Sequence, residues 1–516
     1  MNRFPFHSEN PEHPVLRVCV IGAGPSGLVA SKILKERGIS YRCFEKGSDV
    51  GGLWRFQNDS GTSAAYESLH INSSRQLMAF ADFPMNPSLP DFPHHSHILE
   101  YLEDYTAHFG LKSNTTFQTS VTNVVPIPNE QNQMTGKSTT GYKVEFSDRN
   151  GKVGTEFFDA VIVANGHHWS PKIPKFEGKF AGEILHSHHY KSSDSFRGKN
   201  VLVVGIGNSG VDIACELSRV AKSTLLSTRR GAHIIPKYLL GKPLDRVASK
   251  HFWKFCPLWL RQKLFAGLLK ITRGRQSRYG MPEPNYKVLQ EHPTVSSELL
   301  NLLGHGKIKI KKDISSFADD TVRFVDGTAE AVDAIILATG YQIKFPFLED
   351  DIMDPSGNEI GLYKNVVHPK SQGLFFTGLV QPWGPLMPLA EAQSEWIADL
   401  LQLKAMLPEQ NEMEKVIRND REKIERRYVK STRHTIQVDF YPYLDQIKSA
   451  RSQKNGRPAL PEFRGSSCPA HVSQLSHSQV GGSNAEQTPC PANPSEMHSC
   501  SANPSPDSDS SSQKVA

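Results

Sequence analysis

Two glycine-rich turns, each placed between an apolar run and a helix-like run, constrain this chain of 516 residues more than any other feature. The two turns are Gly22-Ala23-Gly24-Pro25-Ser26-Gly27 and Gly205-Ile206-Gly207-Asn208-Ser209-Gly210. One such turn arises easily by chance, but two in the same strand–turn–helix context predict two dinucleotide sites. The sequence therefore predicts an α/β protein with two Rossmann-like dinucleotide-binding domains.

The residues around the first turn are typical of an FAD or NAD site. Val18–Ile21 predicts a buried parallel strand, and Leu28–Leu34 continues as an apolar-periodic helix. The three glycines allow a tight bend, close approach of a pyrophosphate to the backbone, and close packing of helix on strand. The next strand ends at Glu45, whose carboxylate can accept hydrogen bonds from ribose hydroxyls and would repel a 2′-phosphate. We expect all six residues of the turn and Glu45 to bind the cofactor.

The second turn is followed by basic residues instead of an acid. Val211 and Asp212 begin its helix, and the next strand runs into Thr228, Arg229 and Arg230. Guanidinium groups match phosphate oxygens in charge and in geometry. These five residues, together with Gly205, Gly207, Asn208, Ser209 and Gly210 of the turn, therefore predict an NADPH site. The alternative is that the two arginines form an ordinary solvated turn.

Several further motifs carry a resemblance to one enzyme family. Phe180-x-Gly182-x3-His186-x3-Tyr190 resembles the identifying sequence of the flavin-containing monooxygenases, class B flavoproteins of the dimethylaniline monooxygenase type. Other segments resemble the flavin-cradling turn, the active-site segment and the later motifs of that family: Gly51–Phe56; Tyr66–Leu69, Asn72–Arg75 and Phe80–Pro84; Leu337–Tyr341, Gln381–Gly384 and Glu391–Gln393. The resemblance extends from Arg17 to Tyr443.

This resemblance implies an oxidoreductase that uses FAD, NADPH and O2 to oxygenate small, soft N- or S-nucleophiles through a C4a-hydroperoxyflavin. It implies that Asn72 is the catalytic residue, hydrogen-bonded near the flavin and the nicotinamide; a purely structural turn residue is the alternative. It also implies that His186 stabilises the linker between the two domains. The remaining cofactor contacts expected from the family motifs are Gly52, Leu53, Trp54, Ser73 and Gln393.

Other functions can be weighed against the same residues. Pyridine nucleotide-disulfide reductases need a cysteine pair shortly after the first turn, and residues 51–74 contain no cysteine. Baeyer–Villiger monooxygenases end the identifying sequence in Trp followed by Pro or Asp, whereas this chain has Tyr190 and Lys191. Oxygenation of ketones is therefore the alternative to N- or S-oxygenation. Two intact dinucleotide turns argue against a non-enzymatic scaffold.

These landmarks predict a discontinuous FAD-binding domain with the NADPH-binding domain inserted into it. We expect the FAD-binding domain over residues 15–165 and 332–461, the latter including C-terminal helices, and the NADPH-binding domain over residues 166–331. The return is placed at Val332 because Ala334–Leu337 is typical of a buried strand. A flexible lead is expected over residues 1–14, and a disordered Ser/Pro-rich tail over residues 462–516.

Composition narrows the partners and the compartment. A net charge of +6 makes no case for nucleic-acid binding, and no uninterrupted apolar run is long enough to cross a bilayer. The 7 cysteines form no close CxxC pair, which favours a reducing, cytoplasmic environment. The oligomeric state stays open, and a homodimer is compatible with the sequence.

Two remaining segments invite a site interpretation. His94, His95 and His97 lie in a Pro-rich stretch that lacks the spacing of a known metal site, so we expect a solvated turn and no metal. The aromatic segment Phe252–Ile271 predicts a membrane-surface helix or a lid over the substrate tunnel. Core packing of an insertion in the nucleotide domain is the alternative for that segment.

Overall fold

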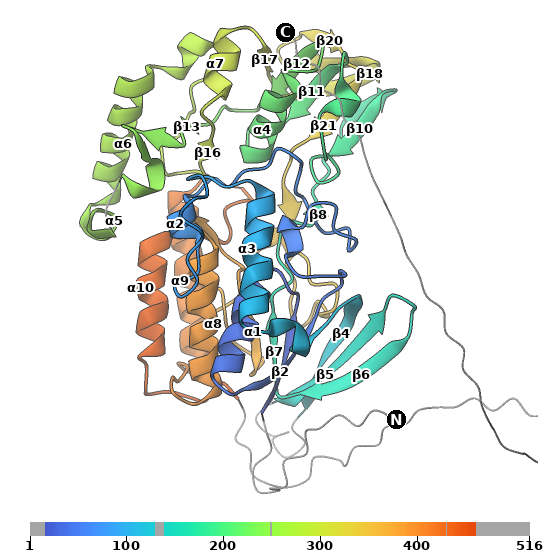
Figure 1. Ribbon diagram of the computed structural model, residues 1–516. Coiled ribbons are helices and arrows are strands. Elements are labelled where there is room, and N and C mark those ends of the chain that lie inside the picture. The colour runs from blue at the N-terminus through green and yellow to red at the C-terminus, as the bar shows by residue number, and fades with distance from the viewer. Residues whose placement is uncertain (1–15, 129–138, 248–249, 430, 461–516) are drawn as a thin grey trace, which may run out of the picture. The chain divides into compact units, whose positions relative to one another are not determined.

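The computed structural model describes residues 16–128, 139–247, 250–429 and 431–460. Figure 1 shows its helices and strands. Two five-stranded parallel sheets organise this part of the chain, one around each glycine-rich turn. The lead expected over residues 1–14 and the tail expected over residues 462–516 lie outside the described residues.

The first sheet contains the strand that leads into the first turn. Its order is β23-β7-β1-β2-β3, and every neighbouring pair is parallel. Ile21 pairs with Phe44 on one side and with Val163 on the other, so the three central strands end at the same edge. The strands are β1 (Arg17–Ile21), β2 (Ser40–Phe44), β3 (Thr115–Thr116), β7 (Ala160–Val163) and β23 (Leu374–Phe376).

The second sheet repeats this arrangement around the second turn, in the order β10-β21-β11-β12-β17, again all parallel. Val204 pairs with Ser227 on one side and with Leu337 on the other. The strands are β10 (Glu183–His186), β11 (Asn200–Val204), β12 (Ser223–Ser227), β17 (Ile308–Lys311) and β21 (Ala334–Leu337).

The expected return to the FAD-binding domain at Val332 is wrong. Strand β21 pairs with β10 and β11 of the second sheet, and the chain rejoins the first sheet only with β23. Both sheets bury their central strands on both faces, so four apolar residues fit either sheet equally well. The FAD-binding domain is discontinuous as predicted, because β23 completes a sheet begun by β1, β2 and β7.

Smaller sheets accompany the two parallel ones. One is antiparallel, with β4 (Thr119–Pro128), β5 (Thr139–Asp148) and β6 (Val153–Phe158), and it stands apart from the labelled helices in Figure 1. Another joins β9 (Glu177–Phe180), β18 (Ile314–Asp319), β19 (Thr321–Phe324) and β20 (Ala329–Ala331). Short pairs are β8 (Ser170–Pro171) with β22 (Tyr341–Gln342), β13 (Ile234–Ile235) with β16 (Thr294–Val295), β14 (Tyr238–Leu239) with β15 (Lys242–Pro243), and β24 (Gln381–Trp383) with β25 (Gln437–Asp439).

The helices pack according to their apolar content. Helix α8 (Met387–Leu401) is buried along almost its whole length, as its apolar sequence requires, and it packs against α1 (Pro25–Glu36) and α10 (Phe440–Arg451). Met413 of α9 (Gln410–Arg427) is buried in the same apolar core as α8 and α10. The others are α2 (Arg75–Met78), α3 (His95–His108), α4 (Asn208–Leu217), α5 (Lys250–Phe255), α6 (Leu258–Arg273) and α7 (Leu299–Gly304).

Candidate functional site

The first glycine-rich turn is built so closely that two of its three glycines leave no room for a side chain. A Cβ at Gly22, whose φ is +104°, would lie 2.8 Å from the carbonyl oxygen of Ala164, and a Cβ at Gly27 would lie 1.7 Å from that of Gly22. At Gly24, the N-cap of α1, the only described neighbour of a Cβ would be the Cα of Gly52, 3.7 Å away. The backbone N–H groups at the start of α1 therefore face a space that suits a pyrophosphate.

Glu45 follows β2 and is fixed against this turn. Its Oε2 accepts a hydrogen bond from the Ala23 N–H (2.7 Å), and its Oε1 accepts one from the Gly47 N–H (2.7 Å). Burial raises the pKa of Glu45, and the two backbone hydrogen bonds oppose that rise. Each carboxylate oxygen keeps a second lone pair, so the group can still accept a ribose hydroxyl.

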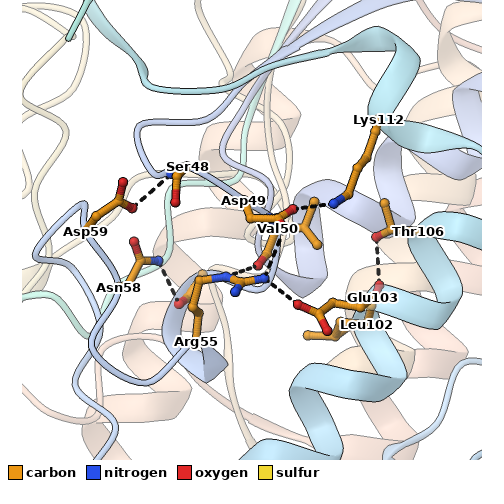
Figure 2. Close-up of polar contacts among 11 residues, drawn as sticks. Ser48, Asp49, Val50, Arg55, Asn58, Asp59, Leu102, Glu103, Thr106 and Lys112 are labelled. Atoms are coloured by element: carbon orange, nitrogen blue, oxygen red, sulfur yellow. Dashed lines mark hydrogen bonds and ion pairs between the residues drawn. The ribbon is translucent and has the colours of Figure 1, made fainter. Parts of the chain in front are cut away.

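The Gly51–Gly52 turn lies over the first glycine-rich turn and leads into a short 3-10 helix, Gly52–Trp54. The Gly51 N–H donates to the Ala23 carbonyl oxygen at 3.0 Å. Figure 2 shows how polar side chains brace the turn: Arg55 donates to the Val50 carbonyl (2.8 Å) and to Glu103 (2.6 Å), Lys112 pairs with Asp49 (2.8 Å), and Asn58 donates to the Gly52 carbonyl (3.2 Å). Sequence reasoning included Arg55 in the motif Gly51–Phe56 but missed the other bracing residues, because no local pattern marks them.

Gln393 supports the first turn indirectly, through Gly378. Its Oε1 accepts the Gly378 N–H at 2.8 Å, and its Nε2 donates to the Tyr443 hydroxyl at 2.7 Å. Gly378 in turn packs on Ser26, since a Cβ at Gly378 would lie 2.0 Å from the Ser26 Oγ. The Gln393 side chain is completely buried, so it positions the loop that covers Ser26.

The second glycine-rich turn has the same close construction. A Cβ at Gly205, whose φ is +116°, would lie 2.4 Å from the Ala338 carbonyl oxygen, and a Cβ at Gly210 would lie 2.1 Å from that of Gly205. Ala338 follows β21 as Ala164 follows β7, which explains why the two stretches have similar sequences. Asn208 accepts the Val295 N–H at 2.7 Å and so ties β16 to the turn. The space at the start of α4 fits a second pyrophosphate.

The three residues after β12, Thr228, Arg229 and Arg230, differ in whether their side chains are free to bind a phosphate. Arg229 is exposed and makes no hydrogen bond or ion pair with the described residues. Arg230 pairs with Glu291 at 3.0 Å and lies over the Tyr286 ring, 5.8 Å from its centroid. Thr228 is buried, and its Oγ1 accepts the Gly231 N–H at 3.1 Å. Arg229 is therefore the guanidinium that is free to meet a 2′-phosphate.

Asn72 carries an unpaired polar atom at the expected flavin-facing turn. Its Oδ1 is buried and has no hydrogen-bond partner among the described residues. The flanking backbone is held by side chains of the second domain: Lys237 donates to the Ile71 carbonyl (3.1 Å), and Asp245 accepts the Ser74 N–H (2.6 Å). Ser73 is half-buried between these contacts. A buried amide oxygen without a donor fits a site that a ligand N–H completes.

The identifying sequence places His186 at the end of β10, against the linker that follows β21. Its Nε2 bonds to the Gly340 carbonyl oxygen (3.0 Å), its Nδ1 accepts the His188 N–H (3.1 Å), and its ring packs edge-on against Tyr341. Because Nδ1 accepts, Nε2 carries the proton and donates. Burial lowers the pKa of His186 to about 4, which keeps the ring neutral at pH 7.

Comparison with known proteins now identifies the family. The model of the FMO-like family, described as flavin-binding monooxygenase-like, matches residues 15–463. This chain belongs to the flavin-binding monooxygenase family. It is accordingly a flavoprotein oxidoreductase that uses FAD and NADPH, as the sequence predicted.

Relatives and solved structures agree with this assignment. Flavin-containing monooxygenase 5 of Oryctolagus cuniculus is 39% identical over 443 residues, which cover 84% of this chain and 82% of the relative. Dimethylaniline monooxygenase [N-oxide-forming] 2 of Pan troglodytes is 35% identical with the same coverage. The S-allyl-L-cysteine S-oxygenase of Allium sativum is similar in structure (TM-score 0.63, 26% identity, 85% and 88% of the two chains). Cyclohexanone monooxygenase shares the fold (TM-score 0.64, 17% identity, 84% and 97%).

In this monooxygenase, Asp212 faces the active-site segment. The Tyr66 hydroxyl donates to Asp212 at 2.8 Å, and burial raises the pKa of Asp212 to about 6. Nearby, Ser68 donates to Glu216 at 2.6 Å. Helix α4 therefore contacts the Tyr66–Asn72 segment through carboxylates, a role that the family motifs did not suggest for Asp212. Its cofactor contact stays a prediction.

The histidine cluster in this monooxygenase starts a helix. His94 caps α3 and accepts the Ser96 N–H, and His95 is buried, which lowers its pKa to about 4. The expected solvated turn is therefore wrong, because a histidine ring can serve as an N-cap acceptor. Within the described ranges, no three His, Cys, Asp or Glu side chains lie close enough together to hold a metal ion.

The aromatic segment forms α5 and α6, and core packing is wrong for it, because none of its apolar residues is buried. Phe255 is 71% exposed and Ile271 is 85% exposed, with Trp259 and Leu264 also exposed. The buried residues of α6 are Arg261 and Gln262. In the part of the chain that the structure describes, no helix combines the length and apolar content needed to span a bilayer.

Proposed function

We propose that this monooxygenase uses NADPH and O2 to oxygenate soft nitrogen or sulfur nucleophiles through a C4a-hydroperoxyflavin. One observation carries the proposal: two closely built dinucleotide turns occur in a chain whose active-site segment holds a buried, unpaired amide oxygen at Asn72. Two related proteins support it by name, since one is N-oxide-forming and another is an S-oxygenase of S-allyl-L-cysteine.

Each group of residues would have a separate role in binding or catalysis. The first turn, Glu45 and Gly52–Trp54 would bind FAD, which supplies the redox and oxygen chemistry when bound. The second turn and Arg229 would bind NADPH. The Asn72 amide would accept one hydrogen bond from bound cofactor and donate another. A soft nucleophile needs no protein base, so we expect few further catalytic residues.

The exposed apolar side chains of α5 and α6 support peripheral membrane contact. Phe255, Trp259 and Ile271 are exposed beside Lys254, Lys263 and Lys270, a composition typical of a helix that lies on a membrane surface. A sedimentation assay with vesicles of phosphatidylcholine and phosphatidylserine checks this, with Trp259→Ser and Ile271→Ser expected to release the protein. Equal sedimentation of parent and variants would contradict it.

We also propose a cytoplasmic location. The four cysteines that the structure describes, Cys19, Cys43, Cys215 and Cys256, are all free, which supports a reducing compartment. Burial raises the pKa of Cys43 to about 12, so its thiol is a packing group. Association into a homodimer stays a prediction, checked by light scattering of the purified chain.

The deciding experiment is a product analysis. Purified holoenzyme is incubated with NADPH, O2 and a panel of tertiary amines, thioethers and ketones, and the products are identified by mass spectrometry with fragmentation. We expect N-oxides or sulfoxides. Esters or lactones would favour oxygenation of ketones, the alternative function. Cyclohexanone monooxygenase has the same fold. Hydrogen peroxide without any oxygenated product would contradict both.

A further inference from the structure

A guanidinium group lies beside the middle glycine of the second glycine-rich turn. The middle glycine of such a turn is where the cofactor approaches the backbone most closely. A Cβ at Gly207 would have Arg433 as its neighbour, with Nη1 and Nη2 at 3.6 Å and Cζ at 3.8 Å. At the equivalent Gly24, the neighbour is the backbone of Gly52. The second turn thus has a cation where the first has a peptide.

Arg433 is available for a ligand. Its guanidinium makes no hydrogen bond or ion pair with the described residues, and the side chain is half-buried. Other arginines of this region are already paired: Arg427 binds Asp439 with two hydrogen bonds (2.7 and 2.9 Å), and Arg230 pairs with Glu291 at 3.0 Å. The charge of Glu291 also acts on Arg433, but this carboxylate is already paired with Arg230.

The backbone that carries Arg433 is held in place. The Arg433 N–H donates to the Ser431 Oγ at 3.3 Å, and the adjacent His434 bonds through Nδ1 to the Val429 carbonyl at 2.9 Å. Beyond it, the Ile436 carbonyl accepts the Gln381 N–H at 2.8 Å and β25 pairs with β24. The guanidinium is therefore presented by a fixed segment next to Gly207.

We propose that Arg433 binds the pyrophosphate of NADP(H), opposite the backbone N–H groups at the start of α4. A guanidinium suits this ligand because its N–H groups can bind two phosphate oxygens at once. The inference rests on the second turn being the NADPH site. NADH and NADPH share the pyrophosphate, so Arg433 sets affinity for both, whereas Arg229 would distinguish them.

Calorimetric titration of oxidised, FAD-loaded enzyme with NADP+ and with NAD+ tests the proposal. We expect Arg433→Ala to weaken both ligands by the same factor, about 10- to 100-fold, as for a lost charge-assisted contact. Arg433→Gln, which keeps much of the side-chain volume, should lose the same affinity, and Arg433→Lys should lose less. FAD content and melting temperature should match the parent. Arg418→Ala, at an exposed position of α9, is the matched control.

Three outcomes would overturn the inference. They are parent-like NADP+ binding by Arg433→Gln, a loss for NADP+ that spares NAD+, and an equal loss in Arg418→Ala. Gly207→Val separates this failure from failure of the site assignment. If Gly207→Val still binds NADP+, the second turn is not the NADPH site; if it loses NADP+ while Arg433→Gln keeps it, only the role of Arg433 is refuted.

Discussion

Asn72→Leu should make the cofactor-free enzyme more stable while it destroys oxygenation. The Asn72 Oδ1 is buried without a partner, and such a group costs about 1–3 kcal/mol of folding free energy. Leucine has a similar volume and no polar atom, so the variant should gain up to about that amount when neither FAD nor NADP+ is bound. Higher stability without cofactor together with lost oxygenation is expected if Asn72 is a catalytic residue whose oxygen has no partner in the fold. It is not expected if Asn72 is only a structural turn residue.

With cofactors bound, the expectation reverses. The parent amide gains its partner, whereas leucine offers neither donor nor acceptor. We expect Asn72→Leu to bind FAD and to accept hydride from NADPH, but to release hydrogen peroxide in place of oxygenated product. The measurements are the melting temperature of the enzyme without FAD and NADP+, and the peroxide and product that the FAD-loaded enzyme forms per NADPH consumed.

Asn301→Leu, at an exposed position of α7, is the control and should change none of these quantities. A lower melting temperature in Asn72→Leu, together with parent-like product per NADPH, would refute the reasoning. It would show that Asn72 only shapes the turn.

Three further predictions test other parts of the site. Gly24→Val should yield colourless protein, because a branched side chain would fill the pyrophosphate space beside Gly52; a normal flavin content would remove the first turn from the FAD site. Changing both Arg229 and Arg230 to Ala should weaken the binding of NADPH more than that of NADH, by about 1.5–3 kcal/mol per charge-assisted hydrogen bond lost. The Arg229→Ala single variant should show most of this loss, because Arg230 is already paired with Glu291. Equal losses for both nucleotides would contradict this. Burial raises the pKa of Asp212 to about 6. Between about pH 4 and pH 6 the folded chain therefore keeps a proton on Asp212 that the unfolded chain releases. The parent should lose up to about 3 kcal/mol of unfolding free energy as the pH rises through this range. Asp212→Asn should lack this loss. If the melting temperatures of both proteins changed with pH in the same way from pH 4 to 8, Asp212 would not be the group responsible.

Much of the fold and of the cofactor sites could be predicted because their signals are local. Within six residues, each glycine-rich turn specifies a bend, a close backbone approach and the start of a helix. A charged residue shortly after the next strand, Glu45 directly after β2 and Arg229 two positions after β12, adds a charge that would select between cofactors. These features depend on backbone sterics and on neighbours close in sequence, so they can be recognised without knowing the tertiary structure.

Sequence alone therefore determined two strand–turn–helix units, their order and the chemistry of their ligands. The tertiary structure decided which sheet each buried strand joins, and it placed β21 in the second sheet against expectation. It also decided which polar groups are left without partners, at Asn72, Arg229 and Arg433. Strand pairing and hydrogen-bond satisfaction depend on residues that are distant in sequence, and an apolar tetrapeptide or a single arginine carries no record of its neighbours in space.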